Sequence, residues 1–228
     1  CLFMPDTHGS MYCCVNDAQG EMLVAINDMA LYDRMPGAFL REQADFLRAQ
    51  EAVVVEANLS AEALGGLRGL SLPPLFADTV SAHKAPRLLP LLPTITGLKT
   101  NRLEAKCLTG IEIVNRADAL KSIHALHELG PRWILLTLGA EGAIVSDGMH
   151  AVFGKPQEMQ TVNTTGCGDA FMAGAVYALM GCATPREVLQ YGLFNAACCA
   201  RSSQAVSPEI DEKSIVARSA EFETEVIE

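Results

Sequence analysis

The segment 163–171 (NTTGCGDAF), followed directly by the apolar run MAGAVYALM, constrains the fold of this chain more than any other part of its sequence. Gly166 and Gly168 enclose one small residue, Cys167, so the backbone can turn its N–H groups inward at this point. A helix is expected to begin at Asp169, and the positive end of its dipole adds to those N–H groups. The pattern predicts a cup for an anion in front of a helix.

Asp169 has two interpretations. A carboxylate on the rim of an anion cup would be repelled by a static phosphate, so Asp169 is better suited to take a proton from an attacking hydroxyl group, as in phosphoryl transfer. Alternatively, Gly-x-Gly-Asp before a helix is a tight turn in which Asp169 is the N-cap. The residues of the loop alone leave both interpretations open.

Helix and strand patterns alternate from about residue 36 onward. The helical segments are 36–50, 60–70, 102–110 and 121–130, one after Asp169 and one after Pro185, and the strand-like segments are 52–59, 74–80, 132–139 and 143–148. Such alternation predicts an α/β fold with a mostly parallel sheet covered by helices. From about Pro208 the chain is polar and acidic and is expected to form a tail.

Two short strand-like runs, 10–15 and 22–26, precede this region, and residues 16–20 between them favour a hairpin turn. An isolated hairpin is marginal in water, so its edges are expected to pair with further strands or with a partner chain, as in a homodimer. We therefore expect a partial β lid at residues 1–33 and an α/β core at residues 34–228.

Length and composition exclude several classes of protein. A chain of 228 residues with 50% hydrophobic and 19% charged side chains can bury a sizeable core and is not expected to be disordered. Its formal net charge of −10 argues against binding to a nucleic-acid backbone. No apolar run approaches the about 20 residues of a membrane span, and no signal-peptide pattern begins the chain, so a cytoplasmic protein is expected.

The eight cysteines include no C-x-x-C pair, and Cys13-Cys14 and Cys198-Cys199 are adjacent in the sequence. Neither a disulfide framework nor a zinc site has this spacing. Most of the cysteines are expected to be buried as small hydrophobic residues.

The segment NTTGCGDAFMAG resembles the C-terminal signature of the ribokinase-like (PfkB) carbohydrate and nucleoside kinases, which usually reads D-T-T-G-A-G-D. The resemblance implies that the amides of Gly166, Cys167 and Gly168 form an anion hole for the transferred phosphoryl group and that Asp169 is the catalytic base. Cys167 replaces the usual Ala, and its backbone N–H serves as well. Asn163 replaces the usual Asp, and this form is similar to that of the pseudouridine kinases within the family.

Two other segments also resemble pseudouridine kinases. Residues 78–84 (DTVSAHK) are similar to their D-P-V-S-x-x-K segment, which implies that Lys84 contacts substrate or phosphate, although a surface lysine is usually just solvated. Residues 20–29 resemble their lid strand, which ends in A-I-N-D-M. Asn27 and Asp28 then lie at the mouth of the substrate site, unless they only turn the chain.

Thr165 is assigned to the same substrate site.

Asn101 and Glu104 have the spacing of a capping box at a helix start. They also match the N-x-x-E motif of ribokinase-like kinases, which implies a role for Glu104 near magnesium, through water. Both roles are compatible, because magnesium usually keeps several of its waters.

The nucleotide side of the site is implied by three further matches. Thr137, Gly139 and Gly142 match the T-x-G-x-x-G segment that lies against the nucleotide in the family, although a hairpin turn also needs such glycines. Asn195 and residues 202–207 resemble the adenine-side loop of the family and its monovalent-cation site, for an ion such as K⁺.

The resemblance covers about residues 10–208 and implies transfer of the γ-phosphate of Mg-ATP to the 5′-hydroxyl of a nucleoside, with pseudouridine as the expected substrate. A kinase for another sugar or nucleoside is one alternative. The N-terminal strand of the family, its substrate-binding Asp and its Gly-Gly motif have no counterpart here. A truncated remnant that binds ATP but phosphorylates a nucleoside poorly is therefore the second alternative.

Overall fold

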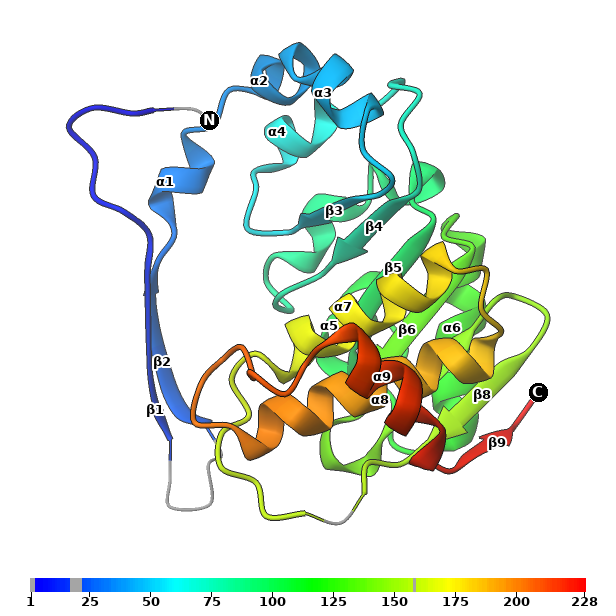
Figure 1. The fold of residues 1–228 in the computed structure, drawn as a ribbon. Helices are drawn as coiled ribbons and strands as arrows, with labels where there is room; N and C mark the ends of the chain where they lie inside the picture. The colour runs from blue at the N-terminus through cyan, green and yellow to red at the C-terminus, as the bar shows by residue number, and fades with distance from the viewer. Residues whose placement is uncertain (1–2, 17–21, 158) are drawn as a thin grey trace. The chain divides into compact units, whose positions relative to one another are not determined.

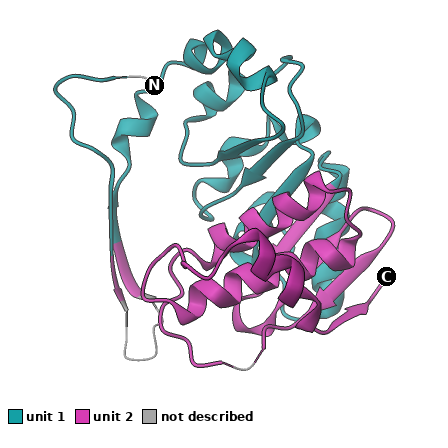
Figure 2. Cartoon of the chain, in the orientation of Figure 1, with its two compact units in different colours: residues 1–13, 26–132 teal, residues 14–25, 133–228 magenta. Residues whose placement is uncertain are grey.

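A computed structural model describes residues 3–16, 22–157 and 159–228 of the chain (Figure 1). The chain forms two compact units, which Figure 2 shows in different colours. Unit 1 comprises residues 1–13 and 26–132, and unit 2 comprises residues 14–25 and 133–228. The division into a lid of residues 1–33 and a core of residues 34–228 stays a prediction.

The two predicted N-terminal strands are present. Strand β1 (Met11–Asn16) and strand β2 (Met22–Asp28) form a two-stranded sheet. Residues 17–20 of the predicted turn lie outside the described residues. Several large apolar side chains of this hairpin are exposed, namely Met11, Tyr12, Val15, Leu23, Val24 and Ile26. Pairing of the hairpin with another chain stays a prediction.

Unit 1 contains three parallel strands in the order β3 (Val53–Glu56), β4 (Leu75–Asp78) and β5 (Gly97–Asn101). Every residue of β4 is buried, as expected for a strand with neighbours on both sides and helices around it. Because the three strands are parallel, their carboxyl ends meet at one edge of the sheet, where α/β proteins place ligands.

The helices of unit 1 are short, apart from the last two. They are α1 (Ala30–Asp33), α2 (Gly37–Glu42), α3 (Ala44–Arg48), α4 (Ala61–Gly65), α5 (Arg102–Thr109) and α6 (Arg116–Glu128), with 3₁₀ turns at Ala85–Leu88 and Leu92–Thr94. The single helix predicted over 36–50 is wrong, because the chain leaves helical geometry at Gln43 (φ −86°, ψ 8°) between α2 and α3.

Besides part of the β1–β2 hairpin, unit 2 contains the strands β6 (Trp133–Thr137), β7 (Ala143–Ser146), β8 (Ala151–Gly154) and β9 (Thr224–Val226), and each neighbouring pair among these is antiparallel. Short loops join β6 to β7 and β7 to β8, and loops of that length allow only antiparallel pairing. The α/β fold class is thus confirmed with a mixed sheet, in which the β3–β4 and β4–β5 pairs are parallel. The helices of unit 2 are α7 (Cys167–Met180), α8 (Pro185–Arg201) and α9 (Glu212–Arg218), with 3₁₀ turns at Gly139–Glu141 and Ser219–Glu221.

The predicted polar tail after Pro208 is wrong. This region forms α9 and β9, and it buries Ile215 and Phe222. The ring of Phe222 packs edge-on against that of Phe194 in α8, with 6.5 Å between the centroids. A few apolar residues among many acidic ones are enough to order this segment, because α8 and β8 provide surfaces for them.

Helices α7 and α8 lie side by side, in yellow and orange in Figure 1, and pack closely because of a glycine. A Cβ atom built at Gly174 of α7 would lie 2.4 Å from the carbonyl oxygen of Tyr191 in α8. Backbone therefore meets backbone at this point. In the described parts of the chain, no helix is long and apolar enough to cross a membrane.

We predict that Gly174→Ala lowers the free energy of unfolding by about 1–3 kcal/mol, because the methyl group forces α7 away from α8. Alanine has a higher helix propensity than glycine, so helix propensity alone would raise the free energy of unfolding. Urea denaturation followed by circular dichroism measures the change.

Gly65→Ala is the matched control, because a Cβ atom at this helical glycine of α4 has no heavy atom within 4 Å. It should leave stability unchanged or raise it by up to about 1 kcal/mol. Equal effects of the two substitutions would contradict the close packing of α7 on α8.

Candidate active site

The glycine loop of unit 2 forms a turn that leads directly into α7. The N–H of Thr165 donates to Oδ1 of Asn163 (2.9 Å), and the N–H of Cys167 donates to the carbonyl oxygen of Thr164 (3.2 Å). Helix α7 begins at Cys167, so the predicted start at Asp169 is wrong by two residues. Asp169 is instead the third residue of the first turn, and it is exposed.

Gly166 is the N-cap of α7, and two constraints require glycine there. Its φ is 87°, in the left-handed region that L side chains rarely adopt. A Cβ atom at this position would also lie 2.4 Å from the carbonyl oxygen of Ala205. The loop is tied to the end of α8 as well, because the N–H groups of Val162 and Asn163 both donate to the carbonyl oxygen of Ala200 (2.8 and 3.2 Å).

The donors that this loop offers to an anion differ in part from those predicted. The N–H of Cys167 is used within the turn, by Thr164. The N–H groups of Gly168 and Asp169 lie in the first turn of α7, where the amides of a helix point out of its start. With the helix dipole they form the positive end of α7, which suits an oxygen of a phosphoryl group. The roles of the four loop residues stay predictions.

Asn163 replaces the Asp of the family pattern, but its side chain still accepts a hydrogen bond within the loop. A carboxamide oxygen accepts the N–H of Thr165 as a carboxylate would. The side chain of Thr165 lies near the hairpin, with Oγ1 3.6 Å from Sγ of Cys14. Its assignment to the substrate site stays a prediction.

The three residues of the Thr137 segment lie at the β6–β7 connection. Thr137 ends β6, and the N–H of Leu138 donates to the carbonyl oxygen of Gly142 (2.8 Å). Gly139 and Gly142 have positive φ, and a Cβ atom at Gly142 would lie 2.1 Å from the carbonyl oxygen of Gly154. Turn geometry therefore explains both glycines, and contact with a nucleotide stays a prediction.

Asn195 presents a polar group that lacks a partner. Its side chain is buried in α8, and Oδ1 has no hydrogen-bond partner among the described residues. A buried polar atom without a partner is rare in a folded protein and suits a ligand or a bound water. This observation favours the predicted place of Asn195 in a binding site.

Asn101 and Glu104 form the predicted capping box in unit 1. The N–H of Glu104 donates to Oδ1 of Asn101 (3.0 Å), and the N–H of Asn101 donates to Oε2 of Glu104 (2.9 Å). The Asn101 side chain also donates to Oε1 (2.8 Å), and the hydroxyl of Thr79 donates to Oε2 (2.5 Å). Glu104 is only 3% exposed, and three donors hold its buried carboxylate in place.

Magnesium fits these residues through water rather than through a protein cage. Within residues 3–16, 22–157 and 159–228, no group of three or more His, Cys, Asp or Glu residues could hold a metal ion. Magnesium in kinases is held mainly by phosphate oxygens and water, with one or two carboxylates. The role of Glu104 near a metal-bound water stays a prediction.

Lys84 is anchored rather than freely solvated. Its ammonium group donates to Oδ1 of Asn58 (2.5 Å), and the Asn58 side chain donates to Glu56 (2.7 Å). Sequence analysis missed Asn58, which follows β3 at the same sheet edge where residues 78–84 follow β4. That shared position after neighbouring parallel strands is the signal that could have revealed it.

The turn after β4 is strained. Val80 has a φ of 60°, which is unfavourable for a β-branched residue. The carboxylate of Asp78 holds this turn through the N–H of Val80 (2.8 Å) and forms a buried ion pair with Lys99 (2.9 Å). Backbone strain that persists in this way is often associated with a functional site.

Asn27 and Asp28 lie at the exposed end of β2. The carboxylate of Asp28 accepts the N–H of Ala30 (3.1 Å), so it does turn the chain into α1. Their role at a substrate mouth stays a prediction.

The expectation that most cysteines are buried is wrong. Among the cysteines in the described part of the chain, only Cys198 and Cys199 are buried, and Cys13, Cys107 and Cys182 are exposed. Cys13 lies on a strand of the hairpin, Cys107 on α5 and Cys182 in the turn after α7, and these positions explain their exposure, because hydrophobicity alone does not bring such a residue into a core.

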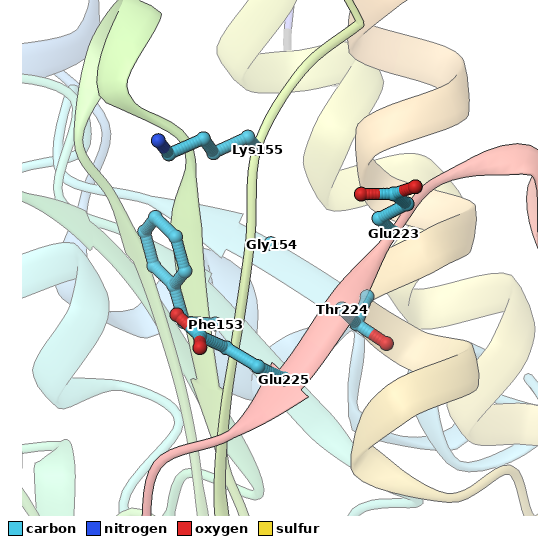
Figure 3. A pocket seen from close by; sticks show the side chains of 6 residues that line it. All are labelled: Phe153, Gly154, Lys155, Glu223, Thr224 and Glu225. Atoms are coloured by element: carbon cyan, nitrogen blue, oxygen red, sulfur yellow. The ribbon is translucent and has the colours of Figure 1, made fainter.

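Unit 2 also has an open pocket that no sequence pattern indicated. It lies where β8 ends beside β9, and Figure 3 shows its lining residues: Phe153, Gly154, Lys155, Glu223, Thr224 and Glu225. None of these residues belongs to the predicted site.

Comparison with known proteins identifies the family. The model of the pfkB family carbohydrate kinases matches residues 1–212. The chain is 36% identical to a pseudouridine kinase of Escherichia coli over 176 residues, which are 76% of this chain and 56% of that protein. It is 27% identical to a guanosine-inosine kinase of Exiguobacterium acetylicum over 215 residues, 91% of this chain and 71% of that protein.

Solved structures agree with the sequence comparison. A carbohydrate kinase from Agrobacterium tumefaciens superimposes with a TM-score of 0.79 at 26% identity, covering 98% of this chain and 73% of that one. The chain spans little more than half the length (56%) of the E. coli pseudouridine kinase that it matches. With a glycine loop at the start of α7, an N-x-x-E capping box and a family match over most of its length, the chain belongs to the pfkB family of carbohydrate kinases.

Proposed function

We propose that the chain transfers the γ-phosphate of ATP to the 5′-hydroxyl of a nucleoside, with pseudouridine as the substrate. The observation that carries this proposal is the loop before α7, where glycine is required at position 166 and an exposed Asp169 follows in the first helical turn.

Each part of the loop has a task in this reaction. The N–H groups of Gly168 and Asp169 and the dipole of α7 stabilise the charge that develops on the transferred group. Asp169 takes the proton of the attacking hydroxyl, for which an exposed carboxylate at a helix start is well placed. Magnesium, when bound, neutralises charge on the phosphate oxygens. Glu104 orients its water.

Pseudouridine is favoured over other acceptors by two observations. The 36% identity to a pseudouridine kinase extends over three quarters of this chain. Lys84 is oriented by Asn58 and Glu56, so its ammonium group is held in one place for a substrate or phosphate oxygen. The similarity to a guanosine-inosine kinase makes another nucleoside the second candidate.

The proposal is tested by ATP binding and by turnover on the same preparation of this chain. Calorimetry measures ATP affinity with magnesium, and product formation is followed with pseudouridine, uridine, guanosine, inosine and ribose. Preferential turnover of pseudouridine supports the proposal. ATP binding without turnover of any acceptor identifies a noncatalytic remnant, and turnover of another acceptor only would overturn the choice of substrate.

Asp169→Asn should lower turnover by about 10² or more with little change in ATP affinity, because the amide keeps the shape but accepts no proton. Asp118→Asn is the matched control, because Asp118 is also the third residue of its helix, α6. It loses the same helix-dipole interaction and should leave turnover unchanged. Near-normal turnover in Asp169→Asn would show that Asp169 is not the base.

Thr79 is proposed as a positioning residue for Glu104. Thr79→Val removes the hydroxyl that donates to Oε2 and should raise the magnesium concentration for half-maximal turnover about tenfold, as is typical when an outer ligand partner is lost. Thr79→Ser keeps the donor and should restore the wild-type value. If both variants have the same magnesium dependence, the contact has no role beyond folding.

A further inference from the structure

Two cysteines of unit 2 meet beneath the loop that precedes α7. Sγ of Cys199, in α8, lies 3.4 Å from the carbonyl oxygen of Thr165 and 3.3 Å from that of Ala205. Sγ of Cys167 lies 3.7 Å from the carbonyl oxygen of Asn163. The side chain of Cys167 is also near enough to lower the pKa of the Cys199 thiol.

The packing of α7 on α8 explains why these thiols meet. The helices are in backbone contact where Gly174 faces Tyr191. Cys167 lies about two turns from Gly174 toward the start of α7, and Cys199 lies about two turns from Tyr191 toward the end of α8. Because the helices are antiparallel and close, Cys167 and Cys199 lie at the same height along the helix pair. A disulfide requires two cysteines that lie opposite each other in this way.

We propose that Cys167 and Cys199 form a reversible disulfide when the protein meets a peroxide, and that this bond closes the glycine loop to phosphate. The Cys167 thiolate attacks one oxygen of hydrogen peroxide, so that an S–O bond forms, the O–O bond breaks and hydroxide leaves. The Cys199 thiolate then attacks the sulfur of Cys167, the S–O bond breaks, and a second hydroxide leaves. Two thiols are oxidised by two electrons, and the peroxide is reduced to two waters once the thiol protons are counted.

The surroundings assign different roles to the two residues. Cys167 is partly exposed and is the first residue of α7, where the positive end of a helix favours a thiolate. Cys199 is buried. Burial raises the pKa of the Cys199 thiol, and the charge of Asp169 adds to this effect, whereas the side chain of Cys167 partly offsets it. Cys167 thus meets the peroxide, and Cys199 resolves the sulfenic acid.

The disulfide would act on the loop through contacts already described. Both S–H donors disappear, so Asn163 loses the thiol proton beside its carbonyl oxygen, and Thr165 and Ala205 lose the single proton of Cys199 that faces both of their carbonyl oxygens. The side chain of Cys167 becomes fixed to α8, and the N–H groups of the first turn of α7 shift with it. This consequence for phosphate binding rests on the proposed function, whereas formation of the disulfide does not.

The neighbouring thiols have other contacts. Sγ of Cys14 faces Oγ1 of Thr165 (3.6 Å), and Sγ of Cys198 accepts from the guanidinium of Arg201 (3.5 Å). Cys198 is buried next to Cys199 in the sequence and is therefore the matched control.

Peptide mapping of the full chain tests the disulfide. Trypsin leaves Cys167 and Cys182 in peptide 133–186, because Pro156 blocks cleavage after Lys155, and it leaves Cys198 and Cys199 in peptide 187–201. A variant with Cys182→Ala and Cys198→Ala therefore keeps a single cysteine in each peptide. After treatment with hydrogen peroxide, mass spectrometry should find the two peptides linked in this variant and separate again after dithiothreitol.

Two results would overturn the disulfide. One is that the two peptides stay separate in the variant while circular dichroism shows that it is folded. The other is that Cys167 accumulates as sulfinic acid without a linked peptide. Adding Cys199→Ala to the variant should abolish the linked peptide.

Calorimetry with ATP and magnesium tests the effect on the loop. Peroxide should raise the Kd of ATP about tenfold, the equivalent of about one charge-assisted hydrogen bond, in the wild type and in Cys198→Ala. Cys199→Ala should show no such change. An unchanged Kd in linked wild-type protein would overturn the closing of the loop. Absence of ATP binding by the reduced chain contradicts the proposed function instead, and peptide mapping still decides the disulfide.

Discussion

The close approach of Gly166 to the carbonyl oxygen of Ala205 determines the form of the candidate site in unit 2. It lets the loop from Asn163 enter α7 in a left-handed turn, so that the helix begins at Cys167 directly after Gly166. The same approach brings the loop against the end of α8, where Cys199 bonds to its carbonyl groups. A larger residue at position 166 would move all of these groups together.

In unit 1, ordinary capping interactions also serve the candidate chemistry. The capping box of α5 satisfies the amides of Asn101 and Glu104, and it also leaves the Glu104 carboxylate buried and immobile. Thr79, which directly follows the neighbouring strand β4, also donates a hydrogen bond to the Glu104 carboxylate. Structural and functional interpretations of N-x-x-E therefore describe the same geometry.

Local patterns predicted the elements that depend on neighbours in sequence. The hairpin strands, the first two parallel strands of unit 1 (β3 and β4) and the β6–β7 pair follow from short apolar runs and turn residues, whereas β5 was not predicted. Strand β9 could not be predicted, because its three residues, Thr224 to Val226, are strand-like only when paired with β8. The break at Gln43 and the start of α7 at Cys167 depend on backbone angles that composition does not reveal.

The sequence by itself determined the family, the presence of a glycine loop in front of a helix and the capping box, because each depends on residue types at fixed short spacings. Only the tertiary structure decided which distant groups meet: Asn58 with Lys84, Thr79 with Glu104, and Cys167 with Cys199. These pairs are separated along the chain and are brought together by parallel strand ends or by the glycine contact of α7 with α8. Such contacts depend on packing, which no local pattern of residues encodes.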